Sequence, residues 1–367
     1  MRNLLAINDL SVQEIDSLIR VAKDIMAHPQ QYSTICHGKK LATLFFEPST
    51  RTRLSFEAAM YELGGCVLSV PGASLSSAAK GESVADTAKV VSCYADIIAM
   101  RHPKEGAPLV AAAHSDIPII NAGDGGHNHP TQTLADLLTI HLEKGGFDHL
   151  TVGFCGDLRY GRTVHSLMQA LSRYRDVRFV LISPPELRVP EYLVQTLLKA
   201  HTVSFVETDT LEEALPSLDI LYMTRIQKER FPDEASYERL KDSYILTKEK
   251  LTAARKDLAI LHPLPRVNEI SVSVDADPRA CYFRQVRNGK YMREALILKL
   301  LGLSENAGED TRDMSDVEER DFVCRNPHCI ISTEQELPRL FRNRDGKVRC
   351  LYCEQAYGLP LNDKQSR

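Results

Sequence analysis

The sequence has no long uninterrupted apolar run. A membrane-spanning helix needs about 18 to 20 such residues, and no stretch of this chain approaches that length. The first residues, MRNLLAINDL, reach Asn8 and Asp9 before an apolar run of signal-peptide length has formed. The sequence therefore indicates that the chain is neither exported nor inserted into a membrane. We expect a cytoplasmic protein without a membrane partner.

Cysteine is sparse along most of the chain. Of the nine cysteines, those outside the C-terminal region lie far apart, at Cys36, Cys66, Cys93, Cys155 and Cys281. Scattered thiols of this kind are typical of a reducing cytosol. The remaining cysteines are clustered and are considered below.

Common cofactor motifs are also missing. The chain has no P-loop and no H-E-x-x-H, and it shows no repeat of solenoid period. TVGFCGDLRYGRT (151–163) could open a dinucleotide-binding fold, but its glycines do not fit G-x-G-x-x-G and no acid follows at the required distance. We therefore expect no cofactor in the chemistry.

The composition is that of a soluble globular protein. Hydrophobic residues make up 43% and charged residues 26% of the 367 residues, and the net charge is -4. This balance does not favour a protein that coats nucleic acid. The length suits two or three domains that each bury a hydrophobic core. Partners must therefore be inferred from local sites.

Short β-rich runs alternate with amphipathic stretches. They are LATLFF (41–46), CVLSV (66–70), DIIAM (96–100), IPIIN (117–121), TVGFCGD (151–157), VRFVLI (177–182), TVSFV (202–206), DILYM (219–223) and LAILH (258–262). A helical stretch from Pro130 to about Lys144, stopped by Gly145 and Gly146, divides the series into two sets. Strands alternating with helices predict an α/β fold with two parallel-sheet domains.

The C-terminal region has a different character. Residues 304–320 are rich in acids and nearly free of apolar residues, which predicts a linker. Beyond it, Cys324 and Cys329 are followed by Cys350 and Cys353, a pattern typical of a tetrahedral zinc site with four thiolates. So short a segment needs a structural metal to fold, so we predict a small zinc-binding β module. Two disulfides are the alternative, and His328 could replace one ligand.

FFEPSTRTRLSFEAAM (45–60) is the first segment that carries chemistry. Pro48 and Ser49 suit the start of a helix that follows a strand, Leu54, Ala58 and Tyr61 are spaced along one face of it, and Gly64 suits its end. The hydroxyls and guanidinium that follow would lie where unpaired backbone N–H groups attract an anion. We predict a phosphate site formed by Ser49, Thr50, Arg51 and Thr52. An ordinary serine-capped helix with solvated arginines is the alternative.

This segment resembles the carbamoyl-phosphate signature of the aspartate and ornithine carbamoyltransferases. Further matches follow in the family's order: SSAAKGESVADT (76–87), MRHP (100–103), NAGDGGHNHPTQTLAD (121–136), GDLRYGRTVHS (156–166), YMTRIQKER (222–230) and LHPLPRVNEI (261–270). The resemblance covers about residues 1–303. It implies a carbamoyl-phosphate-binding domain at 1–133, completed by a helix at about 289–303, and an acceptor-binding domain at 134–288. The acidic linker (304–320) and the zinc module (321–367) then follow.

The resemblance also implies how the first substrate is bound. Arg101, at the end of a predicted strand, would bond phosphate and carbonyl oxygens, while His129 and Gln132 would hold the carbamoyl group. Ser76 and Lys80 would reach into the active site of a neighbouring subunit, which implies a homo-oligomer, most simply a trimer. Ala79 stands where some family members have a second lysine, which reduces the charge of this loop.

The acceptor amine distinguishes the two kinds of transferase. L-aspartate needs guanidinium partners for its carboxylates, whereas ornithine needs acidic or polar ones. Here the matching segments offer Arg162, Arg225 and Gln227, and the ornithine-type S-M-G and H-C-L-P are absent. The family further implies that the backbone of Leu264 and Pro265 contacts the reactants. We expect transfer from carbamoyl phosphate to L-aspartate; another amine such as ornithine, or a catalytically idle scaffold, are the alternatives.

CRNPHCI (324–330) and CLYCE (350–354) resemble the zinc domain of the aspartate carbamoyltransferase regulatory chain. The linker leaves no room for that chain's nucleotide-binding domain, so we expect a structural zinc module without a nucleotide-effector site. A nucleic-acid-binding zinc ribbon is the rival, supported by Arg339, Arg342, Arg344, Lys347 and Arg349. Acids at Glu334, Glu336 and Asp345 dilute that patch, so we expect no nucleic-acid partner.

Overall fold

The structure is a computed structural model that describes residues 2–70, 72, 77–191, 193–195, 203–226, 237–238, 244–304, 314–344 and 346–357. The chain forms two compact units. Unit 1 comprises Met1–Asp9, Pro29–Asn128 and Leu296–Arg367, and unit 2 comprises Leu10–His28 and His129–Ala295. Among the described residues, no helix combines the length and apolarity needed to cross a membrane.

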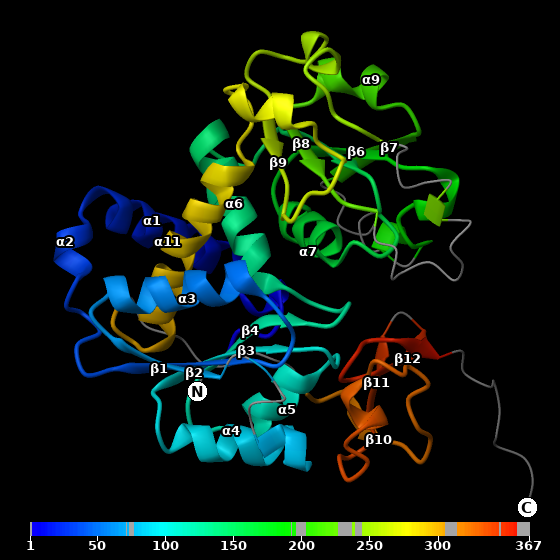
Figure 1. Cartoon of the computed structure of the whole chain (residues 1–367). Coiled ribbons are helices and arrows are strands. Elements are labelled where there is room, and N and C mark those ends of the chain that lie inside the picture. The colour runs from blue at the N-terminus through cyan, green and yellow to red at the C-terminus, as the bar shows by residue number, and fades with distance from the viewer. Residues whose placement is uncertain are drawn as a thin grey trace, which may run out of the picture. The chain divides into compact units, whose positions relative to one another are not determined.

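Unit 1 contains a parallel sheet of four strands in the order β2-β1-β3-β4. The strands are β1 (Lys40–Phe45), β2 (Cys66–Val70), β3 (Ile97–His102) and β4 (Ile119–Asp124). Figure 1 shows α3 (Thr50–Glu62) on one face of this sheet and α4 (Val84–Ser92) and α5 (Ala107–His114) on the other. Covering both faces explains why β1, β3 and β4 are apolar along most of their length.

Helix α3 begins and ends where its sequence predicts, but its buried face differs. Phe56, Ala59 and Met60 are fully buried, whereas Leu54 and Tyr61 are exposed by 51% and 60%. Spacing alone places residues on one side of a helix, and the sheet beneath decides which side is covered. The helix stops before Gly64, whose backbone is left-handed with φ +81°.

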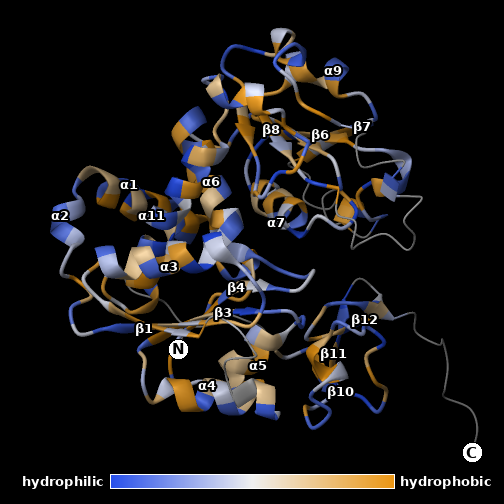
Figure 2. Ribbon diagram, viewed as in Figure 1, coloured by the Kyte–Doolittle hydropathy of each residue, from blue (hydrophilic) through white to orange (hydrophobic). Residues whose placement is uncertain are grey.

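Unit 2 contains a parallel sheet of five strands in the order β7-β6-β5-β8-β9. They are β5 (Thr151–Cys155), β6 (Val177–Ile182), β7 (Val203–Thr208), β8 (Ile220–Met223) and β9 (Ala259–Leu261). In Figure 2 the central strands β6 and β8 are strongly hydrophobic, and every residue of β8 is buried. The prediction of two parallel-sheet α/β domains is therefore confirmed.

Helices connect and flank these sheets. Further α-helices in the described residues include α1 (Val12–Ala27), α2 (Pro29–Tyr32), α6 (Pro130–Lys144), α7 (Arg162–Leu171), α9 (Leu211–Ala214) and α11 (Tyr282–Leu300). Short 3-10 helices span Ile7–Asp9, Ser77–Lys80, Pro185–Leu187, Leu215–Ser217, Lys250–Thr252, Val272–Ala276 and Ile330–Ser332. Helix α6 has the predicted bounds because Pro130 suits its first turn and Gly145, with φ +79°, ends it.

The C-terminal module is a small antiparallel sheet in the order β10-β11-β12-β13. Its strands are β10 (Val317–Glu319), β11 (Leu340–Arg344), β12 (Lys347–Cys350) and β13 (Ala356–Tyr357). The predicted β module is confirmed, but β10 lies inside the stretch predicted to be linker. Its polar side chains hide the strand, because an edge strand is held mainly by backbone hydrogen bonds to its neighbour.

The module packs against the rest of unit 1, beside α5 in Figure 1. Glu105 joins the two parts by its backbone: its N–H donates to the His328 carbonyl at 2.8 Å, and its carbonyl accepts from the Ile330 N–H at 2.9 Å. The Glu105 carboxylate also accepts from the Asn326 amide at 2.6 Å. These bonds attach the loop between Cys324 and Cys329 to the segment that precedes α5.

One hydrophobic core runs through this contact. It contains Ile98 and Val110 from β3 and α5 together with Ile330, Phe341 and Tyr352 from the module. A shared apolar core opposes separation, because separating the two parts would return this surface to water. The module is thus an integral part of unit 1 rather than a free tail.

Gly106 provides a test of this packing. A Cβ at Gly106 would lie 2.5 Å from the Tyr352 Cβ and 2.7 Å from its carbonyl oxygen, and the backbone φ is +85°. Gly106→Ala should therefore loosen the module, lower the melting temperature and speed amide hydrogen exchange in residues 314–357. Gly38→Ala is the control, because Gly38 has φ +79° with open space around it and should cost only the roughly 1–2 kcal/mol of left-handed strain. Equal melting temperatures and equal exchange for the two variants would contradict the packing.

Candidate active site and metal centre

The four clustered cysteines bring their sulfur atoms together in one place. Cys324, Cys329, Cys350 and Cys353 are buried, and their sulfurs all lie within 4.8 Å of one another. Cys324 Sγ lies 3.5 Å from Cys353 Sγ and Cys329 Sγ 3.8 Å from Cys350 Sγ, far longer than a disulfide. Zinc–sulfur bonds of about 2.3 Å in a tetrahedron place the sulfurs about 3.8 Å apart, so this donor set fits zinc. The cluster does not include His328.

The predicted phosphate residues lie at the start of α3. Ser49 is the N-cap residue in extended conformation and its side chain does not cap the helix, while Thr52 is buried with 8% exposure. Thr50 and Arg51 are exposed. Because the first backbone N–H groups of a helix lack intrahelical partners, this end suits an anion.

Arg101 lies next to that helix start. It pairs in register with Phe45, the last residue of β1, and its carbonyl accepts from the Phe46 N–H at 2.8 Å. Its Nε donates to the Glu47 carboxylate at 3.0 Å. Glu47 lies inside the matched segment, but its role was not predicted from the sequence. Partial burial, and then the charge of Arg101, lower the pKa of Arg51. Two guanidinium groups that repel each other in this way define a positively charged site suited to a phosphate.

Lys80 ends the short 3-10 helix Ser77–Lys80 and its side chain is exposed. The sequence predicts a loop here, and the structure differs in forming a 3-10 turn over Ser77–Lys80. Ser76 and Gln227 lie outside the described residues.

In unit 2, His129 and Gln132 lie at the start of α6. His129 is the N-cap residue with 5% exposure, and its carbonyl accepts from the Gln132 N–H at 3.0 Å. Gln132 is half-buried, and its Nε2 donates to Asp136 at 2.7 Å. The predicted pair therefore does occupy the first turn of one helix.

Arg162 and Arg225 follow neighbouring strands of unit 2. Arg162 is the first residue of α7, after β5, and Arg225 follows β8; both side chains are half-buried. The two loops approach closely, because the Thr224 N–H donates to the Cys155 carbonyl at 2.8 Å and a Cβ at Gly156 would meet the Thr224 carbonyl oxygen at 2.5 Å. The carboxyl ends of parallel strands share one edge of the sheet, so both arginines lie at the ligand-binding edge of this fold.

The segment after β9 reaches the same edge and has an internal scaffold. His262 Nδ1 accepts from the Leu264 N–H at 2.7 Å, and His262 Nε2 donates to Glu269 at 2.7 Å. Leu264 has a left-handed backbone, with φ 54°, and precedes the cis peptide bond of Pro265. Burial would raise the pKa of Glu269, but its hydrogen bonds from His262 and Val267 lower it overall. The buried pair of His262 and Glu269 thus holds the backbone of Leu264 in this conformation.

A second set of polar groups, centred on the buried Asp124, links the module to the segment before His129. Asp124, 2% exposed, accepts from the Gly106 N–H at 2.9 Å and the Asn128 N–H at 2.9 Å, and its carboxylate pairs with His127 at 3.0 Å. His127 Nε2 in turn lies 3.4 Å from the carboxylate of Glu354, next to Cys353. The sequence did not indicate the contact between His127 and Glu354, because no short motif connects positions so far apart.

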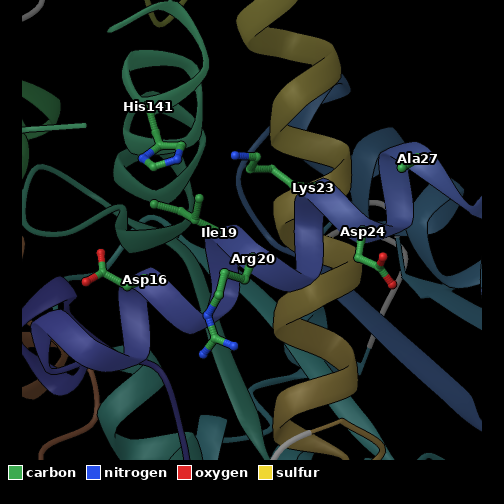
Figure 3. A pocket seen from close by; sticks show the side chains of 7 residues that line it. All are labelled: Asp16, Ile19, Arg20, Lys23, Asp24, Ala27 and His141. Carbon is green, nitrogen blue, oxygen red and sulfur yellow. The ribbon is translucent and has the colours of Figure 1, made fainter. Parts of the chain in front are cut away.

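A hollow of about 420 Å³ lies elsewhere on unit 2, between α1 and α6 (Figure 3). Its lining mixes acids and bases: Asp16, Arg20, Lys23, Asp24 and His141, with Ile19 and Ala27. None of the predicted substrate residues lines it. Its charges do not select one class of ligand.

Sequence profiles identify the two catalytic parts. A profile described as "Aspartate/ornithine carbamoyltransferase, carbamoyl-P binding domain" matches residues 2–142. A profile described as "Aspartate/ornithine carbamoyltransferase, Asp/Orn binding domain" matches residues 148–300. Together they span both parallel sheets.

Individual relatives agree with the profiles. The chain is 60% identical over 303 residues to the aspartate carbamoyltransferase catalytic subunit of Lachnoclostridium phytofermentans, covering 83% of this chain and 99% of that protein. The catalytic subunit of M. jannaschii aspartate transcarbamoylase matches with a TM-score of 0.77 and 46% identity, over 84% of this chain and 100% of that one. The Trypanosoma cruzi enzyme in complex with carbamoyl phosphate and aspartate matches at 0.76 and 37%, over 81% and 95%. This chain belongs to the aspartate/ornithine carbamoyltransferase family.

Proposed function

We propose that the chain transfers the carbamoyl group of carbamoyl phosphate to L-aspartate, giving N-carbamoyl-L-aspartate and phosphate, the committed step of pyrimidine biosynthesis. Relatives at 58–60% identity carry the name aspartate carbamoyltransferase catalytic subunit. The observation that carries the choice of acceptor is the nature of the side chains at the sheet edge of unit 2. Arg162 and Arg225 are cations there, which suits the two carboxylates of aspartate and repels the distal ammonium of ornithine.

Residues of unit 1 support the proposed binding of the phosphate group. The paired charges of Arg51 and Arg101, with the hydroxyls of Ser49, Thr50 and Thr52, support binding of the dianionic phosphate. Glu47 accepts the hydrogen bond from Arg101 Nε, and this orients the guanidinium so that its other N–H groups can bind a ligand. Residues 1–133 with about 289–303 would form the carbamoyl-phosphate-binding domain, and 134–288 the aspartate-binding domain.

The chemistry needs no cofactor in this proposal. The neutral amine of aspartate attacks the carbamoyl carbon, and a C–N bond forms as the carbonyl oxygen becomes an oxyanion. The C–O bond to phosphate then breaks, and the phosphate takes up the amine proton. Thr52, Arg101 and His129 would donate hydrogen bonds to the oxyanion, an effect worth roughly 3–4 kcal/mol for one donor. Gln227, Leu264 and Pro265 would position the aspartate.

The active site is proposed to be shared within a homotrimer, with Ser76 and Lys80 supplied by a neighbouring chain. The exposure of Lys80 at the end of its 3-10 turn supports this role, because its side chain can extend to a ligand outside its own unit 1. Sharing would make assembly a condition of activity.

The C-terminal module is proposed to hold a structural zinc ion through Cys324, Cys329, Cys350 and Cys353 and to correspond to the zinc domain of the regulatory chain. Zinc would supply folding free energy to a segment with little core of its own, without entering the reaction. No nucleotide-effector domain accompanies it in this proposal.

Turnover with two amines tests the proposed function. Purified protein with carbamoyl phosphate should form carbamoyl aspartate from L-aspartate and no citrulline from ornithine. Arg225→Ala should raise the KM for aspartate by about tenfold or more, since one charge-assisted contact is lost. Turnover of neither amine at millimolar concentrations would leave only the scaffold alternative, and turnover of ornithine would reassign the acceptor.

Mixing two inactive variants tests the shared site. Arg51→Ala and Lys80→Ala should each lose about 100-fold or more in kcat/KM. After subunit exchange at equal amounts, about a quarter of the sites in random trimers should contain neither defect, so about a quarter of the wild-type activity should return. Arg51→Ala mixed with an Arg51→Ala/Lys80→Ala double variant is the control and should stay inactive. No recovery after exchange verified by mass spectrometry would place Lys80 in its own chain's site.

Zinc removal tests the metal centre. Cys350→Ser, or prolonged chelation, should lower the melting temperature and loosen the assembly, because a ligand bound only by the folded state stabilises that state. The chemistry per folded chain should stay within about twofold of wild type. Cys66→Ser is the matched control, since Cys66 is exposed and remote in sequence from the cluster. An unchanged melting temperature and mass after verified zinc loss would contradict a structural role.

A further inference from the structure

A buried carboxylate lies behind the start of α6. Asp136 has no exposed surface, and its Oδ1 accepts from Gln132 Nε2 at 2.7 Å and from Gln285 Nε2 at 2.6 Å. Its Oδ2 accepts from the Tyr222 hydroxyl at 3.0 Å. Three different elements, α6, α11 and β8, therefore converge on one side chain.

Arg293, on α11, also faces Asp136, and its charge favours the ionised carboxyl. Burial raises the pKa of Asp136 to about 7, while the hydrogen bonds from Gln132, Gln285 and Tyr222 and the charge of Arg293 act in the opposite direction. The groups that face Asp136 are thus all donors or cations. Such a pocket is built to hold a hydrogen-bond acceptor.

In its ionised form, which prevails above its pKa, the Asp136 carboxylate can only accept hydrogen bonds, and this fixes the orientation of Gln132. The amide of Gln132 must direct its Nε2 toward Asp136, which leaves its carbonyl oxygen Oε1 as the atom that it can offer to a ligand. A carbamoyl group carries an NH2, which needs an acceptor of this kind. The opposite amide orientation would present two donors to that NH2.

The same carboxylate reaches the segment after β9 through Gln285. Gln285 is 1% exposed, and its Oε1 accepts from the His262 N–H at 3.0 Å. His262 holds the N–H of Leu264, whose backbone belongs to the proposed aspartate site. Asp136 therefore sets the orientation of two amides, one at the start of α6 and one beneath the 262–266 segment.

We propose that Asp136 is a positioning residue that makes the carbamoyl site selective for an amide over a methyl group, by holding the Gln132 carbonyl oxygen toward the ligand. This inference rests on the proposed carbamoyl transfer and on the role of Gln132 in it. Asp136 itself does not touch the reactants. Its effect is on recognition of carbamoyl phosphate, in addition to packing.

Discrimination between carbamoyl phosphate and acetyl phosphate measures this effect. Acetyl phosphate keeps the phosphate and carbonyl but has a methyl in place of the NH2, so a variant that is merely less stable loses affinity for both equally. The measured quantity is the inhibition constant of acetyl phosphate divided by the KM of carbamoyl phosphate. Asp136→Leu and Gln132→Ala should each reduce this ratio by about tenfold, the scale of one hydrogen bond.

Two further variants separate positioning from stability. The double variant Asp136→Leu/Gln132→Ala should have the same ratio as Gln132→Ala alone, because both changes remove one interaction. Asp136→Asn should restore most of the ratio: its Oδ1 can accept from both glutamines while its Nδ2 donates to the Tyr222 oxygen. Should the leucine variant fail to fold, Asp136→Ser serves in its place, since the shorter side chain cannot reach Gln132.

Thr139→Val is the matched structural control. Thr139 lies one turn further along α6, is fully buried, and its hydroxyl accepts from the Asn288 amide of α11 at 3.0 Å. Breaking this bond between the same two helices should lower the melting temperature and leave the ratio unchanged. A ratio that stays at the wild-type value in Asp136→Leu or Asp136→Ser, or that falls further in the double variant, would overturn the proposal. A wild-type protein without turnover would instead defeat the proposed function, a separate result.

Discussion

The buried carboxyl group of Asp136 is the constraint on which much of unit 2 depends. Placing a carboxylate out of water is costly unless donors surround it, and Gln132, Gln285 and Tyr222 supply three. The cost is still visible, because burial raises the pKa of this carboxyl to about 7. The folded chain thus binds this proton more tightly than the unfolded chain, whose Asp pKa is about 3.9. This group therefore lowers the free energy of unfolding as the pH rises through that interval.

The architecture of both units was predictable from local patterns. Alternating strands and helices indicated two parallel sheets, and Pro130 and Gly145 defined α6 because each has a strong conformational preference at a helix end. Two features were not predictable: the exposure of Leu54 and Tyr61 on α3, and the existence of the polar strand β10. Burial of a helix face depends on the neighbouring sheet, and an edge strand needs no hydrophobic pattern to pair.

The candidate site was predictable where a contiguous motif contains it. Arg51 and the four cysteines stand in such motifs, and the structure brings Arg51 close to Arg101 and the cysteines into one cluster. Glu47 was missed because its partner Arg101 lies far along the chain, and Asp136 was missed because two of its three donors, Gln285 and Tyr222, do so as well. Asp136 did carry a signal, an acid within the apolar helical stretch LADLL (134–138), where a buried partner is the physical expectation.

The packing of the zinc module on unit 1 has a consequence for behaviour in dilute solution. Where a module and its docking surface belong to separate chains, dilution releases one from the other. Here the surface around Glu105 and the loop of Asn326 are joined by one backbone, so their encounter has an effective concentration in the millimolar range for a short connection. Docking then does not depend on how much protein the solution contains. The docked module, with its contact between Glu354 and His127, would therefore withstand a dilution that separates a two-chain complex.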